Sequence, residues 1–205
     1  MQQDLLPLFP LRMVLLPGAP AALHIFEDRY KEMIGDAIAN GREFGIVLAS
    51  DKGIVNTGCT AVVDQVTQKY DDGRMDIVAV GRRRFEILFL NEEKDYLQGA
   101  VEYFDDDEED SPPAELQQRV ESGFEDLQTI EDKSEDSGGD AKLSFRVAGL
   151  VEDVNLRQMM LGLRSETARL KQLDEYLPSY VARLREAGRV RELARRNGHG
   201  RRTVS

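Results

Sequence analysis

The chain is poor in the residues that build metal sites and disulfides. Its 205 residues include one cysteine, Cys59, two histidines and no tryptophan. A single cysteine excludes an internal disulfide, and one cysteine with two histidines leaves too few soft ligands for a structural zinc site. We therefore expect no bound metal.

Motifs for nucleotide chemistry are also missing. No stretch fits Gly-x-x-x-x-Gly-Lys-Ser/Thr, and the glycine spacing supplies no dinucleotide-binding fingerprint ahead of a helix. His24 and Cys59 could be a base and a nucleophile, but no third orienting group is indicated. Cys59 also falls in a predicted strand, where a thiol is usually buried and inert. The sequence therefore predicts a protein with no cofactor and no catalytic residues.

Long apolar runs are absent as well. None approaches the length of about 20 residues that spans a bilayer, and the opening Met-Gln-Gln-Asp lacks the basic region of a signal peptide. Hydrophobic residues make up 41% of the chain and charged residues 32%, as in an ordinary globular protein. We expect a cytoplasmic protein that makes no membrane contact.

The net charge of −11 comes from one segment. Between Glu102 and Asp140 there are 16 acidic and two basic residues, a local charge of −14, whereas the remainder has 22 acidic and 25 basic residues, or +3. Asp105 to Asp110, six carboxylates in a row, is typical of a solvated linker. We predict that the acidic segment pairs with basic surface of the same chain or a dimer mate, through Arg82, Arg84 and the C-terminal arginines. Exposed pairs contribute little stability, so the predicted effect is salt-sensitive compaction.

The opening of the chain is its most constrained part. Between Leu5 and Tyr30 four prolines remove backbone donors and restrict the residues before them, so this apolar stretch cannot form a helix. We predict short extended segments, with strands at Met13–Leu16 and Leu23–Phe26. A helix then begins near Glu27 or Asp28.

Further strand patterns follow this helix. They cover Phe44–Ala49, Thr57–Gln68, Met75–Val80, Arg82–Leu90 and Tyr96–Phe104. In a regular strand, side chains alternate between faces, so Arg82 and Arg84 are expected on one face and Arg83 on the other. By the same alternation Phe85, Ile87 and Phe89 are expected on one face, with Glu86, Leu88 and Leu90 on the opposite one. Many short strands with one early helix predict a closed or nearly closed barrel, because open edges would otherwise remain exposed.

The rest of the chain reads as helices. A first helix is predicted by one apolar stripe, formed by Leu116, Val120, Phe124 and Leu127. A second helix, a short third helix and a long fourth helix follow it. The apolar spacing of the last helix continues through Pro178, which favours a kink over a break. The predicted organisation is a barrel lobe over 1–105, an acidic linker with the first helix over 106–140, and a helical lobe with a basic tail over 141–205.

Several segments carry a family resemblance. Leu-Pro-Leu-Phe-Pro-Leu, Val-Leu-Leu-Pro-Gly and Leu-His-Ile-Phe-Glu-Asp-Arg-Tyr resemble the opening of the Lon N-terminal, or substrate-binding, domain. Val-Gly-Arg-Arg-Arg-Phe-Glu-Ile and the stretch from Phe145 to Leu177 resemble later parts of the same family. The resemblance implies an α+β fold, a PUA-like β-barrel of about six strands with one early helix, followed by an α-helical bundle lobe. The ATPase and peptidase modules of full-length Lon proteases do not fit in this chain.

The function implied by the resemblance is non-catalytic polypeptide binding. The chain would be a stand-alone adaptor or assembly partner, and its partners would be unfolded or damaged polypeptides or a protease or chaperone. A PUA-type RNA-binding protein and a small-molecule-binding module are the alternatives, and a homodimer also stays open. Nucleic acid is disfavoured because the pI is near 4.8 and no aromatic platform accompanies the arginines.

The candidate site residues lie in two stretches. His24 with Glu27 and Arg29 is interpreted as a polar cluster that fastens the junction between the second strand and the first helix. Arg82 and Arg84 are interpreted as partners of the acidic segment, with phosphate binding as the alternative. The candidate polypeptide-binding or junction residues are His24, Phe26, Glu27, Arg29, Tyr30, Arg82 and Arg84.

Overall fold

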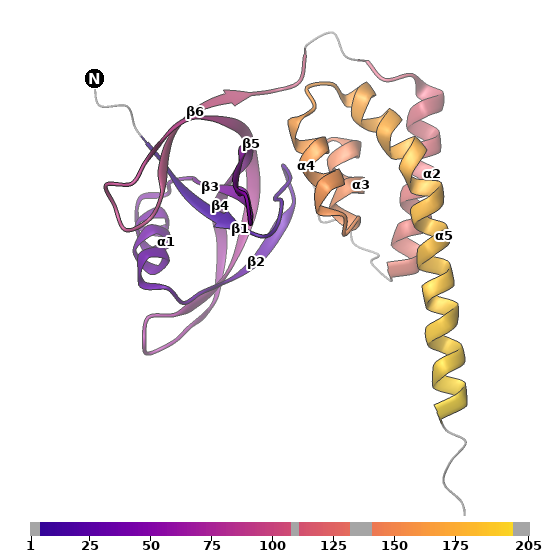
Figure 1. Cartoon of the computed structure of the whole chain (residues 1–205), viewed down its shortest axis with the longest axis horizontal. Helices are drawn as coiled ribbons and strands as arrows, with labels where there is room; N and C mark the ends of the chain where they lie inside the picture. The colour runs from indigo at the N-terminus through magenta and orange to yellow at the C-terminus, as the bar shows by residue number, and fades with distance from the viewer. Residues whose placement is uncertain (1–4, 108–110, 132–140, 199–205) are drawn as a thin grey trace, which may run out of the picture.

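The structure consists of a β-barrel lobe followed by a helical lobe (Figure 1). It is a computed structural model and describes residues 5–107, 111–131 and 141–198, with side chains to residue 194. The elements are β1 (Leu6–Leu11), β2 (Pro20–Ile25), α1 (Asp28–Asn40), β3 (Phe44–Ser50), β4 (Gly53–Lys69), β5 (Met75–Asn91), β6 (Gln98–Phe104), α2 (Ala114–Glu131), α3 (Leu143–Leu150), α4 (Val154–Gly162) and α5 (Glu166–Gly198). The predicted α+β class, with a barrel of about six strands, one early helix and a helical lobe, is confirmed.

Five of the strands form a nearly closed ring. The order of the sheet is β2-β5-β4-β3-β1-β6, and β5 also pairs with β6, which joins the two sides. β1 and β3 run parallel, and the other pairings are antiparallel. Ring closure leaves few strand edges without a partner, in agreement with the expectation from the strand count.

β5 pairs with three other strands, β2, β4 and β6. Its first part, Met75–Val80, lies between β2 and β4, and its second part, from Arg84 onward, pairs with β6. The sequence suggested two strands separated at Gly81, but β5 is continuous over 17 residues. Register shifts opposite β4 and β6 bend it, so one strand takes part in both halves of the barrel.

The opening segment enters the barrel core. The predicted strand at Met13–Leu16 is wrong: the strand is β1, Leu6–Leu11, and Leu15 and Leu16 are buried in irregular backbone after it. Prolines are tolerated in β1 because its ladders are short, with pairing to β6 limited to Leu6 and Pro7. The chain then turns at Gly18, whose φ of 77° favours glycine.

Gly81 allows this turn to approach β5. The N–H of Gly81 donates to the carbonyl of Ala19 at 3.0 Å, and the N–H of Gly18 donates to the carbonyl of Gly81 at 3.0 Å. A Cβ at Gly81 would lie 2.2 Å from the carbonyl oxygen of Leu16, which is backbone and cannot rotate away. The opening segment and β5 therefore require glycine at this position.

The first prediction concerns this contact. We expect Gly81→Ala to lower the free energy of unfolding by about 3 kcal/mol or more, the upper range for overpacking, because backbone must move. Gly35→Ala is the matched control: Gly35 lies in α1 with no atom within 4 Å of an added Cβ, and alanine there should stabilise by about 1 kcal/mol. Urea unfolding measures both. Equal stability of the two variants would show that the Leu16 contact is unimportant.

The helical lobe packs as its apolar spacing indicated. The stripe of α2 is buried against α5, and α5 continues through Pro178 as one helix. Its main buried residues are Leu170, Leu173, Leu177, Tyr180 and Val181. The lobes share one apolar core, and α4 packs on β4, where the side-chain amide of Gln158 donates to the carbonyl of Thr57 at 3.1 Å.

Candidate functional site

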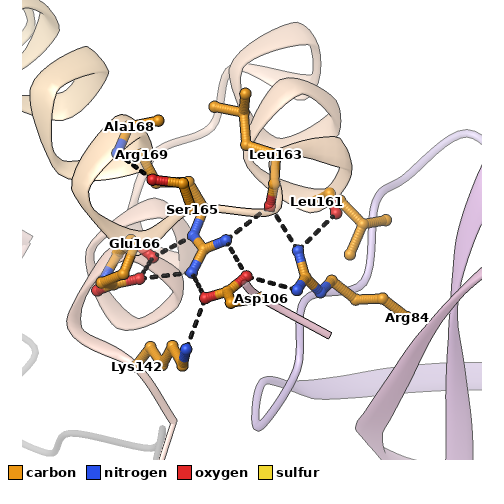
Figure 2. Close-up of polar contacts among 10 residues, drawn as sticks. Arg84, Asp106, Lys142, Leu161, Leu163, Ser165, Glu166, Ala168 and Arg169 are labelled. Atoms are coloured by element: carbon orange, nitrogen blue, oxygen red, sulfur yellow. Dashed lines mark hydrogen bonds and ion pairs between the residues drawn. The ribbon is translucent and has the colours of Figure 1, made fainter. Parts of the chain in front are cut away.

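A buried ion cluster joins the two lobes (Figure 2). Asp106, just after β6, accepts hydrogen bonds from Arg84 of β5 at 2.6 Å, from Lys142 at 2.6 Å and from Arg169 of α5 at 2.6 Å. Arg169 makes a second contact to the other carboxylate oxygen. One carboxylate thus connects the barrel, the segment between the lobes and two helices.

Further groups complete this inter-lobe ion cluster. Glu166 accepts from Arg169 at 2.6 Å and from the hydroxyl and N–H of Ser144 at 2.6 and 3.0 Å. The carbonyl of Leu163 accepts from Arg84 at 2.6 Å and from Arg169 at 2.7 Å. Glu166 also places a negative charge at the N-terminus of α3, which the helix dipole favours. The buried charges therefore have directional partners, as burial requires.

The electrostatics of the cluster follow from burial and partners. Burial alone would raise the pKa of Asp106, but hydrogen bonds from Arg169 and Lys142 outweigh it and hold that pKa well below its usual range. Burial lowers the pKa of Arg84 in spite of Asp106. For Arg169 burial acts in the same direction, but hydrogen bonds to Asp106 and Glu166 raise the pKa. The Asp106 side chain is 3% exposed and the Arg169 side chain is 0% exposed. Because both are out of reach of a ligand, we assign the cluster a structural role, which is to hold the two lobes together.

The predicted docking of the acidic segment is correct for Arg84 and for one C-terminal arginine. Asp106 pairs with Arg84, and Asp126 of α2 pairs with Arg185 of α5 at 2.7 Å. Arg82 is exposed, with no partner recorded within the described residues. The main pair is buried, so its expected effect is on stability rather than on salt-sensitive compaction. Residues 108–110 and 132–140, and the arginines after residue 194, lie outside the described side chains.

The triple arginine does not form one basic surface. Arg83 donates to Glu43 at 2.9 Å and stacks over the ring of Tyr103 at 3.8 Å, whereas Arg84 is buried. The expected grouping of Arg82 with Arg84 on one face is wrong because β5 carries an extra residue between its pairings at Gly81 and Arg84. Such a bulge interrupts alternation. The arrangement gives little support to phosphate binding.

The other predicted residues lie near the start of α1. His24 does not pair with Glu27 and Arg29 as expected: its Nδ1 lies 2.5 Å from Asp76 of β5, and Glu27 and Arg29 pair with each other at 2.6 Å. Tyr30 is buried, with its ring 4.2 Å from that of Phe9. Tyr30 therefore belongs to the core.

An exposed aromatic group remains at this end of the barrel. The Phe26 side chain is 58% exposed and stacks beside His24 with ring centroids 5.8 Å apart. Tyr70 donates to Asp76 at 2.8 Å. Hydrogen bonds from His24 and then Tyr70 lower the pKa of Asp76. Of the predicted residues, His24 and Phe26 form one accessible pair, and Glu27 and Arg29 form another.

The sequence interpretation missed an open strand edge on β5. The last pairing between β4 and β5 joins Thr57 to Glu86, so from Ile87 to Asn91 the β4-facing side of β5 has no strand partner among the described residues. Alternate residues there direct N–H and C=O groups away from β6. We call residues Ile87–Asn91 the open β5 edge.

The open β5 edge is also apolar. Leu88, Phe89 and Leu90 are 59%, 48% and 44% exposed. Leu88 is the extra residue of a bulge, because Ile87 pairs with Val101 and Phe89 with Ala100. The bulge turns Phe89 outward, so its predicted place beside Phe85 and Ile87 is wrong. The signal was four successive apolar residues, a pattern that a regular half-buried strand does not show.

The described ranges offer little for metal binding or nucleophilic catalysis. No group of three or more His, Cys, Asp and Glu side chains there could hold a metal ion. Burial raises the pKa of Cys59 to about 12, which makes this thiol a poor nucleophile. No helix in those ranges is long and apolar enough to cross a membrane.

Comparisons with known proteins agree on one family. The model of the ATP-dependent protease La (LON) substrate-binding domain matches residues 5–187. A Lon N-terminal domain protein from Xanthomonas campestris has a similar structure, with a TM-score of 0.70, 26% identity, and coverage of 84% of this chain and 98% of that one. The N-terminal domain of Mycobacterium avium complex Lon protease has a TM-score of 0.62 and 16% identity, with coverage of 85% of this chain and 98% of that one. At this identity the likeness supports the fold alone.

Curated relatives match over a shorter range. The Lon proteases of Parabacteroides distasonis and Flavobacterium johnsoniae are each 28% identical to this chain, over 123 and 120 residues. These matches cover 56% and 54% of this chain and 15% of each protease. The similarity therefore concerns one part of those enzymes.

Proposed function

This chain belongs to the Lon substrate-binding domain family, and from that premise we propose that it is a non-catalytic module that binds extended apolar polypeptide at the open β5 edge. The clients are unfolded or damaged polypeptides, and a protease or chaperone is the partner that receives them. The observation that carries the proposal is the coincidence of unpaired strand backbone with three exposed apolar side chains, Leu88, Phe89 and Leu90.

The physical basis is addition of a strand. An extended client forms main-chain hydrogen bonds with an open edge whatever its sequence, and alternate side chains of the client contact the apolar residues. Natural proteins usually protect long apolar edges with charge, proline or a covering element, because such edges pair with other chains. Leu88 to Leu90 carry neither charge nor proline, and only the bulge at Leu88 interrupts the edge. The arrangement suits a protein that must accept many sequences.

The inter-lobe ion cluster supports this role from a distance. Arg84 precedes the open edge in the same strand and is fixed by Asp106 and by the carbonyl of Leu163. A strand that is already ordered loses less conformational entropy when a client binds. The cluster thus contributes to binding by holding β5 in place.

His24 and Phe26 define a second surface that we propose as a lesser contact. β2 pairs only with β5 in the described ranges, so its other edge is open too. That edge begins with Pro20, which offers no N–H and weakens strand addition. Phe26 therefore serves as the comparison surface in the experiment below.

The second prediction tests the proposed function. We expect Leu88→Ser with Phe89→Ser to weaken binding of a fluorescent, reduced and carboxymethylated protein by about 10- to 30-fold. Burial of each half-exposed side chain contributes about 1 kcal/mol, and 1.4 kcal/mol corresponds to tenfold. Fluorescence anisotropy measures the affinity. The thermal midpoint should change little because both side chains are exposed.

Two control variants make the test specific. Val190→Ser with Leu193→Ser removes two apolar side chains of α5 that are 56% and 57% exposed, and should leave the affinity unchanged. Phe26→Ser should weaken binding less than the β5 variant does. Unchanged affinity of the β5 variant, or equal losses in all three, would contradict binding at the open β5 edge.

A further inference from the structure

Acidic residues bracket the open β5 edge at both ends. Glu86 comes just before it, and Glu92 and Glu93 come just after it, both exposed. The N–H of Glu93 donates to the side chain of Asn91 at 3.0 Å, so the chain turns directly beyond the strand. The apolar residues Leu88 to Leu90 therefore lie between Glu86, which is within β5, and Glu92, which comes just past its end.

The negative charge before the edge is reinforced by the neighbouring strand. Glu86 pairs directly with Glu102 of β6, which is exposed. Like charges directly opposite each other destabilise a sheet. Arg164 reaches Glu86 at 3.5 Å, a distance too long for a strong hydrogen bond. Two carboxylates thus lie side by side with weak compensation.

One basic residue, Lys94, follows Glu93 directly in the sequence. Its ammonium group donates a hydrogen bond to the hydroxyl of Tyr96 at 2.7 Å and lies 4.0 Å from Glu32 of α1, which is a weak ion pair. Glu92 and Glu93 have no basic partner recorded in the described part of the chain.

We propose, on the basis of the proposed function, that the open β5 edge prefers apolar segments bracketed on both sides by lysine or arginine. A client strand paired with β5 advances at the same rise of about 3.3 Å per residue. Glu86 is still paired with Thr57 of β4 and Glu92 follows the last residue of β5, so a client pairs within Ile87–Asn91 and its basic residues lie just outside the paired stretch. Because Leu88 is the extra residue of a bulge, these five residues correspond to four or five in a regular client strand. The preferred segment has two basic residues five or six positions apart with apolar residues between them.

The spacing follows from charge complementarity rather than from total charge. Opposite charges attract most at short range, and interactions beyond about 8 Å are largely screened at physiological salt. Two basic residues grouped at one end of a client can reach one acidic position and not both. The number of basic residues in a client therefore does not by itself determine its affinity, and their position at both ends of the apolar segment matters.

The third prediction measures this preference with short synthetic peptides. All have the same four-residue apolar centre, bracketed by lysine, glutamine or glutamate, and a fourth peptide has both lysines at one end. In low salt we expect the lysine-bracketed peptide to bind about fivefold tighter than the glutamine peptide, the size expected of two exposed ion pairs. The glutamate peptide should bind more weakly, and the one-ended lysine peptide should lose most of the advantage. At about 0.5 M salt the differences should shrink.

Charge-removed variants identify the acidic residues responsible. Glu86→Gln, Glu92→Gln and Glu93→Gln together should abolish the advantage of the lysine brackets and leave affinity for the glutamine peptide unchanged. The matched control removes three exposed acidic residues of α2, Glu115, Glu121 and Glu125, and should retain the advantage.

The outcomes separate the two proposals. Equal affinity for lysine and glutamate peptides, or an advantage that survives in the β5 triple variant, overturns the charge preference while binding of the glutamine peptide upholds the proposed function. If the glutamine peptide does not bind, or binds equally to the Leu88 and Phe89 serine variant, the proposed function itself is overturned and the charge preference fails with it.

Discussion

A chain that lacks residues 1–18 should no longer unfold cooperatively. The deletion removes β1, which lies between β3 and β6, and leaves the ring open. It also removes Leu8, Leu15 and Leu16, which are 0%, 2% and 1% exposed. Each buried leucine contributes about 2 to 5 kcal/mol, against about 5 to 15 kcal/mol for a whole domain. The summed loss from these leucines is as large as the whole free energy of unfolding expected for such a domain.

Thermal unfolding followed by near-ultraviolet circular dichroism checks this fourth prediction. A control of similar size ends the chain after Gly188, which removes the exposed residues 189–194 of α5, including Val190 and Leu193, and everything beyond them. The control should unfold cooperatively with nearly the parent midpoint. A sharp transition of the N-terminal deletion near the parent temperature would show that the opening segment is peripheral.

Replacement of Asp106 by asparagine should also cause a large loss of stability. Arg84, Arg169 and Lys142 would then lack their shared carboxylate, and removal of one partner from a buried ion pair costs about 3 to 5 kcal/mol. For a chain of this size about 1 kcal/mol changes the midpoint by roughly 2 to 4 °C. We expect the thermal midpoint to fall by about 6 to 20 °C in this fifth prediction.

The pH dependence of this loss has a definite sign. The pKa of Asp106 is lower in the folded protein than the value of about 3.9 in an unfolded chain. Its contribution is therefore fully present above about pH 5 and is lost as the pH falls through and below about 4. The difference in stability between the parent and the asparagine variant should shrink over that acidic range.

The neighbouring acidic residue supplies the control. Asp105 is exposed, and Asp105→Asn should change the free energy of unfolding by no more than about 0.5 kcal/mol at neutral pH. Urea titrations at several pH values measure all three proteins. A stability of the Asp106 variant equal to that of the Asp105 variant, or a difference that grows in acid, would contradict the role assigned to the inter-lobe ion cluster.

Sequence patterns predicted the elements whose signals are local. The stripe from Leu116 to Leu127 is buried as its spacing indicated, and α1 ends where Asn40-Gly41, a usual helix stop, stands in the sequence, with Gly41 in the left-handed region at φ of 60°. The continuity of α5 through Pro178 also followed from spacing. These features depend on helix periodicity and on the conformational range of glycine, both of which a sequence displays.

The misplaced residues lie mainly where strands bulge. Arg84 turned inward and Phe89 outward because β5 carries extra residues opposite β4 and β6. A bulge depends on which strands pair and in what register, and that information is long-range. The contact between His24 and Asp76 is also long-range, because it requires β2 and β5 to be neighbours in the sheet. The open β5 edge could not be located before the end of the β4 pairing at Thr57 was known.

The central claim is that extended polypeptide pairs with the open β5 edge, and amide hydrogen exchange resolved by residue tests it most directly. Addition of a reduced, carboxymethylated client should slow exchange at alternate amides between Ile87 and Asn91, those that point away from β6. Amides already bonded to β6 should change little. Unchanged exchange along Ile87–Asn91, with slowed exchange near His24 and Phe26 instead, would contradict the claim.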